Sequence, residues 1–310
     1  MGEFIYFTEE QKRQASEVDL ESFLACRGEK MIPSGHEKRL CSDHSVTIRG
    51  NTWFDHETQK GGGPVSFLET FQGMSYSEAI LILLGGENGQ AFTTVKERVV
   101  EPKAQFELPK RSDIMRRMYG YLAKSRMIDW DIISHFVRAG LLYEDEKYHN
   151  CVFVGTDQNG VPRHAHKRST NNKGKAFRIN VEGSDLRYCF HHNGTDGSLY
   201  VFEAPIDLLS YISLHQDGWE THNYTSCCGT SSIPVLQMLG TMKAPEMVFL
   251  CLDNDKAGQA ACERMEKEIK ERYDIDIRRL IPELKDWNDD LVNQKREQEV
   301  ANLCPVMSGL

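Results

Sequence analysis

Residues 199–211 read LYVFEAPIDLLSY, and this stretch, with VFLCLDNDKAG at 248–258 and IPELKDWNDDL at 281–291, decides the fold. The first two stretches begin with apolar runs typical of buried strands, and a helical pattern follows each run. In an open α/β sheet, side chains just beyond the carboxyl ends of the strands converge on one crevice. We therefore expect five acidic side chains to share one site: Glu203, Asp207, Asp253, Asp255 and Asp286.

Five carboxylates in one crevice indicate metal chemistry. Like charges repel and raise each other's pKa, so the group cannot ionise fully without a counter-charge. Divalent cations supply it, and an all-oxygen carboxylate site suits Mg²⁺ or Mn²⁺ and acts on phosphates. The alternative for a single acid is a solvated surface charge, or a helix N-cap for Asp207 and Asp255. The complete set in this order favours a functional site.

From residue 199 onward, strand and helix patterns alternate regularly. The strand-like runs are LYVFEA, HNYTSCCG, EMVFLCLD and DIRRLI, and the longest helical stretch between them runs from Ala257 to Tyr273. This alternation predicts a parallel sheet with helices on both faces. The fold class is therefore mixed α/β.

The N-terminal part is organised differently. Residues 9–29 have a helical pattern with Asp19 as a cap, and β-like runs follow at 45–48 and 52–54. KGGGP at 60–64 is a breaker. After it we expect a short helix, a turn at Gly73 and a second helix from Ser75.

The middle of the chain connects these parts. Residues 87–110 are polar with scattered proline and predict a linker, and residues 111–140 predict two amphipathic helices. At 310 residues the length suits two or three domains. The predicted segments are a small module at 1–86, the linker at 87–110, a basic subdomain at 111–198, the α/β domain at 199–292 and a tail at 293–310.

The net charge of −9 is unevenly distributed. Residues 101–198 carry 16 Lys and Arg against 12 Asp and Glu, whereas residues 199–310 carry 11 against 19. A bound cation would offset part of the C-terminal excess of acid. The basic middle segment is suited to a phosphate backbone.

Cysteine usage and hydropathy bear on the compartment. The nine cysteines form no C-x-x-C pair and lie mostly in apolar contexts, which indicates reduced, buried thiols. We interpret Cys227 and Cys228 as strand core rather than a redox pair. The N-terminal MGEFIYFTEEQKRQ lacks the apolar core of a signal peptide, and no apolar run is long enough to span a bilayer. These features predict a cytoplasmic protein with no membrane partner.

CVFVGTDQNGVPRHAHKRS at 151–169 predicts a strand, a turn and a second strand. The stretch from Val161 to Val181 contains no acid, and a further strand is expected over 176–181. Clustered cations of this kind suit contacts with nucleic-acid phosphates, and the alternative is a solvated hairpin. The predicted nucleic-acid contacts are Arg163, Lys167, Arg168, Lys173, Lys175 and Arg178.

The order strand–Glu, strand–Asp-x-Asp, Lys-Asp resembles the toprim domain shared by primases, topoisomerases and some nucleases. Gly229-Thr230 and Ala257-Gly258 match its pattern as well. The stretch 111–292 resembles the catalytic core of bacterial replicative primases. EAPIDLLSY and KDWND are most similar to primase-like toprim proteins of plasmids and conjugative elements.

The resemblance implies roles for the acids. Asp207, Asp253, Asp255 and Asp286 correspond to metal ligands, and Glu203 to a ligand or the general acid/base. Two metals there would activate a 3′-hydroxyl and hold the leaving pyrophosphate, or act in hydrolysis. The family has a second carboxylate two residues after the Lys-Asp position, where this chain has Asn288. Either Asp289 substitutes for it or one metal is held more weakly.

Residues 18–80 resemble the zinc-binding domain of bacterial primases, which uses C-x-x-H followed by C-x-x-C. Cys41 and His44 retain the first pair, but the second pair falls on Asp55 and Thr58. Tetrahedral zinc needs four ligands, and threonine is a poor one. We therefore expect the domain without its zinc. Trp53 and Phe54 are expected to pack its small core, and base stacking is the alternative.

The resulting hypothesis is a primase-like protein of a mobile element. It would bind single-stranded DNA and nucleotides and synthesise primers with Mg²⁺ or Mn²⁺, with a relaxase or helicase of the same element as a candidate partner. Two alternatives remain open. One is a metal-dependent toprim nuclease, and the other is a catalytically silent DNA-binding accessory of plasmid replication or transfer.

Overall fold

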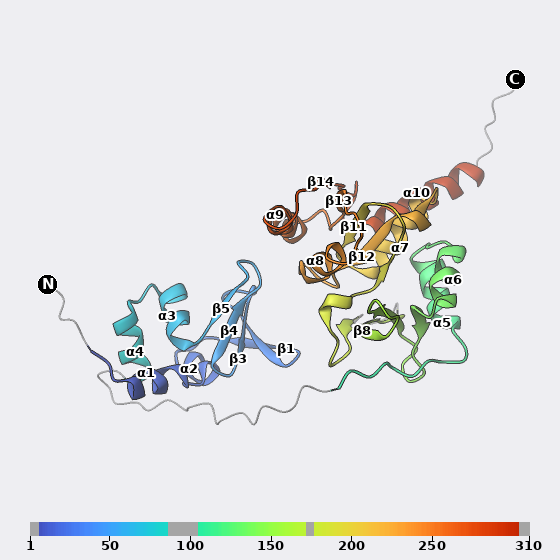
Figure 1. The fold of residues 1–310 in the computed structure, drawn as a ribbon. Coiled ribbons are helices and arrows are strands. Elements are labelled where there is room, and N and C mark those ends of the chain that lie inside the picture. Colours follow the sequence, from blue (N-terminus) through green and yellow to red (C-terminus); the bar gives the residue numbers. More distant parts are fainter. Residues whose placement is uncertain (1–5, 86–104, 172–176, 304–310) are drawn as a thin grey trace, which may run out of the picture. The chain divides into compact units, whose positions relative to one another are not determined.

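The computed structural model describes residues 6–85, 105–171 and 177–303. The chain forms two compact units, Met1–Pro102 and Lys103–Leu310 (Figure 1). Most of the predicted linker lies outside the described residues, as does the end of the predicted tail. Within the described ranges, no helix combines the length and the apolar character needed to cross a membrane.

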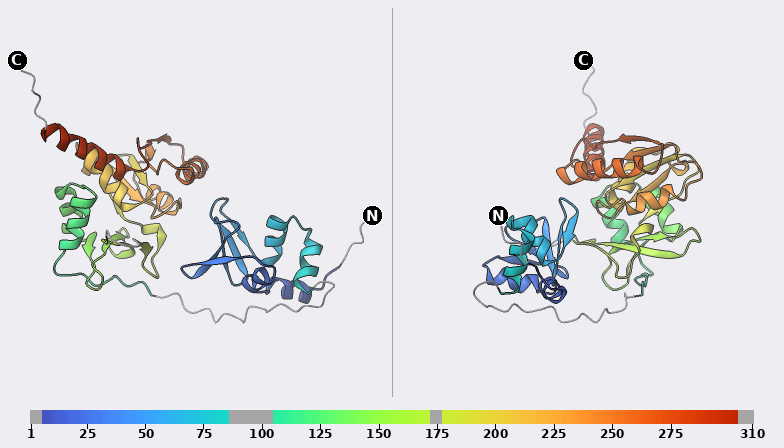
Figure 2. Two further views of the ribbon diagram at one scale, coloured as in Figure 1. Left: turned by 180° about the vertical axis from the view of Figure 1, so that it is seen from behind. Right: turned by 60° about the vertical axis from the view of Figure 1, so that its left-hand side comes forward.

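Within residues 6–85, helices pack with one antiparallel sheet (Figure 2). The sheet has the strand order β1-β2-β3-β4-β5, so each strand pairs with its neighbours in the chain. The strands are β1 (Met31–Ser34), β2 (Glu37–Leu40), β3 (Val46–Arg49), β4 (Thr52–Asp55) and β5 (Lys60–Gly62). The helices are α1 (Glu9–Ser16), α2 (Leu20–Cys26), α3 (Pro64–Gln72) and α4 (Tyr76–Leu83).

Local capping agrees with the sequence pattern in this unit. The Asp19 carboxylate accepts a hydrogen bond from the Ser22 N–H at 2.7 Å, which caps α2. Gly73 ends α3 in the left-handed conformation with φ 64°, and Ser75 caps α4. The predicted break at KGGGP comes later than expected, because Lys60–Gly62 form β5. A Cβ at Gly62 would lie 2.1 Å from Ser66 Oγ, so the glycine allows this strand to pack on α3.

The two aromatic residues of β4 have different environments. Trp53 is buried, and its indole N–H donates a hydrogen bond to Ser66 Oγ at 3.0 Å. Phe54 is 37% exposed. The core prediction is therefore confirmed for Trp53 and wrong for Phe54, because consecutive residues of a strand face opposite sides of the sheet.

The first half of the second unit is α-helical and then antiparallel β. A π-helical turn (η2, Gly120–Ser125) lies between α5 (Arg116–Tyr119) and α6 (Trp130–Arg138). Its signature is the hydrogen bond from the Arg126 N–H to the Tyr121 carbonyl, which spans five residues. The sheet order is β6-β7-β8-β9. Its strands are β6 (Leu142–Glu144), β7 (Cys151–Thr156), β8 (Pro162–Arg168) and β9 (Arg178–Asn180), and β7–β8 is the predicted hairpin.

The second half of this unit contains the predicted parallel sheet. Its order is β10-β12-β11-β13-β14, with β10 antiparallel at one edge and the other four strands parallel. The strands are β10 (His191–His192), β11 (Ser198–Phe202), β12 (Asn223–Ser226), β13 (Met247–Leu250) and β14 (Asp276–Arg279). The helices are α7 (Pro205–Leu214), α8 (Ile233–Leu239), α9 (Lys256–Lys270) and α10 (Trp287–Leu303), with 3₁₀ turns η3 (Leu186–Tyr188) and η4 (Trp219–Thr221).

Helices cover both faces of this sheet, as predicted. On one face Val201 packs in a core with Val235 of α8 and Met265 of α9. On the other, Phe202 packs with Tyr211 of α7 and Trp287 of α10. Because successive side chains of β11 point to opposite faces of the sheet, this strand contributes to both cores.

The core beneath α7 and α10 continues into the first half of the unit. Phe136 of α6 and Phe153 of β7 belong to the same buried cluster as Phe202 and Tyr211. The segments expected as separate subdomains, 111–198 and 199–292, thus pack on one shared core. Helix α10 continues to Leu303, well beyond the expected start of the tail at 293.

Candidate active site

The carboxyl ends of the parallel strands bring the predicted acids to one edge of the sheet. Glu203 directly follows β11, and Asp253 lies three residues beyond β13, which pairs with β11 in parallel. Asp207 lies in the first turn of α7, where Pro205 starts the helix. Asp286 immediately precedes α10. This arrangement follows the expectation for the carboxyl edge of an open α/β sheet.

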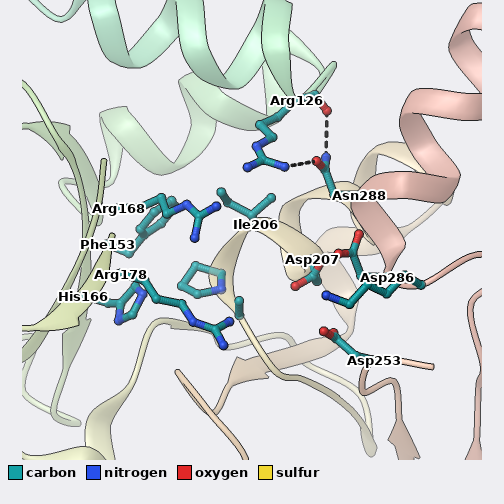
Figure 3. Close-up of a pocket in the computed structure, with 13 residues that line it drawn as sticks. Arg126, Phe153, His166, Arg168, Arg178, Ile206, Asp207, Asp253, Asp286 and Asn288 are labelled. Atoms are coloured by element: carbon teal, nitrogen blue, oxygen red, sulfur yellow. Dashed lines mark hydrogen bonds between the residues drawn. The ribbon is translucent and has the colours of Figure 1, made fainter. Parts of the chain in front are cut away.

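A cavity of about 280 Å³ opens at this edge. Asp207, Asp253 and Asp286 form one side of it, and Arg168 and Arg178 face them from the antiparallel sheet (Figure 3). The cavity is also lined by Arg126, His166, Lys285 and Asn288. The cavity therefore has an acidic side and a basic side.

The acids on this edge resist ionisation. Burial, followed by the charges of Asp286, Asp253 and Glu203, raises the pKa of Asp207 well above its usual value. Burial and the charges of Glu203 and Asp286 raise the pKa of Asp253 to about 7. Burial also raises the pKa of Glu203, although the Arg178 guanidinium, 3.6 Å from its Oε1, opposes this shift. The group needs positive charge to ionise at neutral pH.

One carboxylate oxygen has no protein partner. Asp253 Oδ1 is buried and makes no hydrogen bond. Buried polar atoms are almost always paired, so this oxygen indicates a missing ligand. A hard dication held by carboxylate oxygens would satisfy it, which is the donor set that Mg²⁺ and Mn²⁺ prefer. The residues around the cavity thus fit the predicted metal. Asp207, Asp253 and Asp286 line the cavity and are positioned to hold it, whereas Glu203 lies at the same edge without lining the cavity.

Asp255 has a structural task. It caps α9, and its Oδ1 accepts a hydrogen bond from the Gly258 N–H at 2.9 Å. It does not line the cavity, although its charge contributes to the raised pKa of Asp253. The N-cap that was the alternative for Asp255 is therefore present, and the role of Asp255 as a metal ligand stays a prediction. The N-cap alternative does not describe Asp207, because Ala204 occupies the cap position of α7.

Asn288 is a bridging residue. Its buried amide donates hydrogen bonds to the Arg126 carbonyl at 2.8 Å and to Ser210 Oγ at 2.9 Å, and its Oδ1 accepts one from Arg126 Nη1 at 3.0 Å. A carboxylate has no proton to donate, so only the amide makes this set. Asn288 therefore positions Arg126 in the cavity wall. The substitution of Asp289 for the absent carboxylate stays a prediction.

Arg168 and Arg178 lie on neighbouring strands, in directly paired positions of β8 and β9. Both line the cavity. The Tyr121 hydroxyl oxygen accepts a hydrogen bond from Arg168 Nε at 3.2 Å and another from Arg126 Nε at 2.9 Å. One phenol therefore orients two of the three guanidinium groups of the wall.

The other predicted basic contacts lie elsewhere. Lys167 Nζ pairs with the buried Asp145 carboxylate at 2.9 Å, and Arg163 pairs with Asp157 at the hairpin turn at 2.8 Å. Neither lines the cavity, because β8 alternates and presents only His166 and Arg168 to it. Lys173 and Lys175 lie outside the described residues. Arg126 and Lys285 also line the cavity, and neither was predicted as a nucleic-acid contact.

In the first unit, hydrogen bonds hold the residues at the second pair of positions expected for zinc ligands. Asp55 Oδ2 accepts a hydrogen bond from the Thr58 hydroxyl at 2.6 Å, and Oδ1 accepts one from the Glu57 N–H at 2.9 Å. Although burial opposes it, hydrogen bonding from Thr58 and Ser45 lowers the pKa of Asp55. Cys41 and His44 are both exposed. The carboxylate is stabilised here by the protein itself.

Comparison with known families supports the toprim assignment. Residues 200–291 match the family described as Toprim-like, which confirms the predicted toprim domain. Residues 120–196 match a family described as a protein of unknown function, DUF3991. The uncharacterized protein pXO2-78 of Bacillus anthracis is 26% identical over 320 residues, covering 94% of this chain and 92% of its own length.

Solved structures similar to this chain include primases. The primase fragment of the bacteriophage T7 primase-helicase protein has a TM-score of 0.46 and 15% identity, covering 84% of this chain and 94% of that one. The Aquifex aeolicus primase, with zinc-binding and RNA polymerase domains, has a TM-score of 0.39 and 16% identity, covering 96% and 85%. The E. coli primase catalytic core has a TM-score of 0.39 and 17% identity, covering 61% and 71%.

Proposed function

We propose that this toprim-domain protein is a primase-type nucleotidyltransferase that binds single-stranded DNA and joins nucleotides into short primers. The observation that carries the proposal is the cavity in which Asp207, Asp253 and Asp286 face Arg168 and Arg178. A nucleoside triphosphate is polyanionic and travels with divalent cations, so it needs an acidic side for the metal and a basic side for the phosphates.

The basic side is suited to phosphate oxygens. Guanidinium groups present several N–H donors in a planar fork and bind phosphate in a bidentate manner. Arg126 and Arg168 are oriented in advance by Tyr121, which limits the side-chain entropy lost on binding. We assign these two residues and Arg178 to the phosphates of the incoming nucleotide.

The acidic side would hold Mg²⁺ or Mn²⁺. When bound, the metal would lower the pKa of the attacking hydroxyl and stabilise charge on the leaving group. Glu203 lies at the same edge with a raised pKa and close to Arg178. We assign Glu203 the role of the general base that accepts the proton of the attacking 3′-hydroxyl. A carboxylate whose pKa is nearer neutrality accepts this proton more readily.

The test is incubation of the full chain with single-stranded DNA, all eight nucleoside triphosphates and Mg²⁺ or Mn²⁺, with products resolved on a sequencing gel. Glu203→Gln is the test variant, and Glu271→Gln, an exposed acid just beyond α9, is the matched control. New short oligomers made by the wild type and control but not by Glu203→Gln support the proposal. Shortened template lost in the variant identifies a nuclease. DNA binding without any product identifies an accessory protein.

The remaining assignments extend this proposal. We propose that the chain acts on DNA of a mobile element, as the similarity of EAPIDLLSY and KDWND to plasmid-encoded proteins suggests. A relaxase or helicase of the same element is the proposed protein partner. Co-purification of the full chain with each candidate would test the pairing, and a reproducible failure with both would exclude it.

A further inference from the structure

A second group of potential metal ligands lies in the second unit, apart from the acidic edge. His164 of β8, Cys189 between η3 and β10, and Cys228 just after β12 place one ligand atom each within 4.8 Å of one another. His164 is 0% exposed and Cys189 is 1% exposed. Three segments that are distant in the sequence thus contribute soft or borderline ligands to one buried point.

The imidazole of His164 lacks a partner at one nitrogen. Its Nδ1 is buried and makes no hydrogen bond, and its Nε2 lies 3.7 Å from Cys189 Sγ. A fully buried ring nitrogen without a partner is exceptional in a folded protein. The protein thus leaves one nitrogen of this buried imidazole unsatisfied, next to two cysteine sulfurs that lie within metal-ligand reach of the ring.

His166 lies beside the group and is also buried. Its Nδ1 is 2.7 Å from Asn180 Oδ1, and a proton donated from Nδ1 to this oxygen would leave the electron pair of Nε2 available for a ligand. Metal-bound histidines are commonly oriented by such a hydrogen bond on the remote nitrogen.

The backbone separates Cys228 from the cysteine before it. Cys228 has φ 51°, a left-handed conformation that non-glycine residues rarely adopt. Cys227 packs in the apolar core with Leu199 and Val235, whereas Cys228 joins Cys189 and His164. Of the two cysteines expected to form strand core, Cys227 packs in the core one residue beyond the end of β12, and the expectation is wrong for Cys228.

We propose that His164, Cys189 and Cys228 bind one Zn²⁺ ion, with His166 or a water molecule as the fourth ligand. Two thiolates and an imidazole are a donor set that selects zinc over magnesium. With Zn–S near 2.3 Å and Zn–N near 2.0 Å, tetrahedral ligand atoms lie roughly 3.3–3.8 Å apart, so the group closes by about 1 Å on binding.

This ion would connect the two walls of the active-site cavity. His166, next to the group, lines that cavity (Figure 3). Gly229, next to Cys228, donates its N–H to the Glu203 carbonyl at 3.0 Å. Zinc would therefore join β8, which carries Arg168, to the loop that holds Glu203. The site is a structural one, and its existence does not depend on the reaction that the cavity performs.

The test is metal analysis of the untagged full chain, purified without added zinc or chelator. We expect about one equivalent of zinc, held without exchange on desalting. Replacement with Co²⁺ should produce a thiolate-to-cobalt charge-transfer band, a readout that needs no variant. Cys189→Ser and Cys228→Ser should each lose the metal and the band.

Two cysteine variants are the controls. Cys227→Ala removes the adjacent buried thiol, and Cys41→Ser removes the thiol expected from the zinc-binding resemblance in the first unit; both should retain the metal. Three results would overturn the proposal. One is wild-type protein that contains no zinc and takes up no Co²⁺. Another is metal that is lost with Cys41→Ser, and the third is metal that is retained in Cys228→Ser.

Discussion

Two aspartates, the buried Asp55 of the first unit and the half-buried Asp253 of the second, show how differently the chain surrounds the same side chain. Asp55 ends β4 in the first unit, and its two oxygens accept hydrogen bonds from Thr58 and Glu57. Asp253 follows β13 in the second unit, and its Oδ1 has no partner. The pKa of Asp55 is lowered, whereas that of Asp253 is raised to about 7. Burial alone does not identify a binding residue; a buried carboxylate that lacks partners does.

The largest expected effect concerns Asp253. Asp253→Asn should abolish any divalent-dependent turnover, by more than about a hundredfold, because it removes a metal ligand. The metal-free variant should unfold at the same temperature as the wild type or higher, since an unsatisfied buried charge is lost. Gel-based turnover and thermal unfolding measure the two quantities. Unchanged turnover would remove the metal site from this edge.

Neighbouring residues of β8 provide the second contrast. Arg168→Gln should reduce turnover by about ten- to a hundredfold, since a charge-assisted contact with phosphate is lost. Lys167→Gln should affect stability instead, because it leaves the buried carboxylate of Asp145 without its cation. Steady-state kinetics and urea unfolding separate the outcomes. If the two variants reduced turnover equally, the assignment of turnover to the face of β8 that carries Arg168 would be wrong.

The pH dependence of metal binding gives a third measurement. Because the pKa of Asp253 is about 7, protons compete with the cation below neutrality. Mn²⁺ affinity, followed by electron paramagnetic resonance, should rise as pH rises through about 7, by roughly tenfold per unit below that value. In the metal-free protein the sign is opposite: a carboxyl pKa raised by folding adds stability at low pH, and this is lost as pH rises towards 7. Affinity independent of pH would contradict the assignment.

The smallest expected effect is in the first unit. Asp55→Ala should destabilise the protein by about 1–3 kcal/mol, since Thr58 and Glu57 lose a buried acceptor. Because folding lowers the pKa of Asp55, its stabilisation is present above the unfolded value, near 4, and is lost as pH falls through the folded value. Urea unfolding followed by Trp53 fluorescence reports on this unit. A loss of activity without loss of stability would make Asp55 a functional residue after all.

The acidic edge was predictable because the rule that creates it is local. Glu203 and Asp253 each follow an apolar strand within three residues, and the parallel pairing of β11 with β13 brings the ends of these strands to the same edge of the sheet. The helices of the first unit were predictable for the same reason, since Asp19, Gly73 and Ser75 act on their own turns.

The basic wall was only partly predictable, because it depends on contacts between remote segments. Arg126 is held at the cavity by a hydrogen bond to Asn288, which lies 162 residues away in the chain. The cluster of cations in β8 predicted Lys167 and Arg168 equally as nucleic-acid contacts. Clustering in the sequence does not show which of these side chains lies on the face of the strand that lines the cavity. The group at Cys228 depends on a left-handed backbone that nothing in its neighbouring sequence indicates.

The π-helical turn at Gly120–Ser125 has a consequence for how sequences of this kind are aligned. A π turn contains about one residue more than an α turn, because its hydrogen bonds span five residues instead of four. Each residue turns a helix by about 100°, so a relative with one residue fewer here would direct the side chain at Arg126 elsewhere. A one-residue gap in an alignment of this segment would therefore mark a functional difference, just as a substitution of Arg126 would.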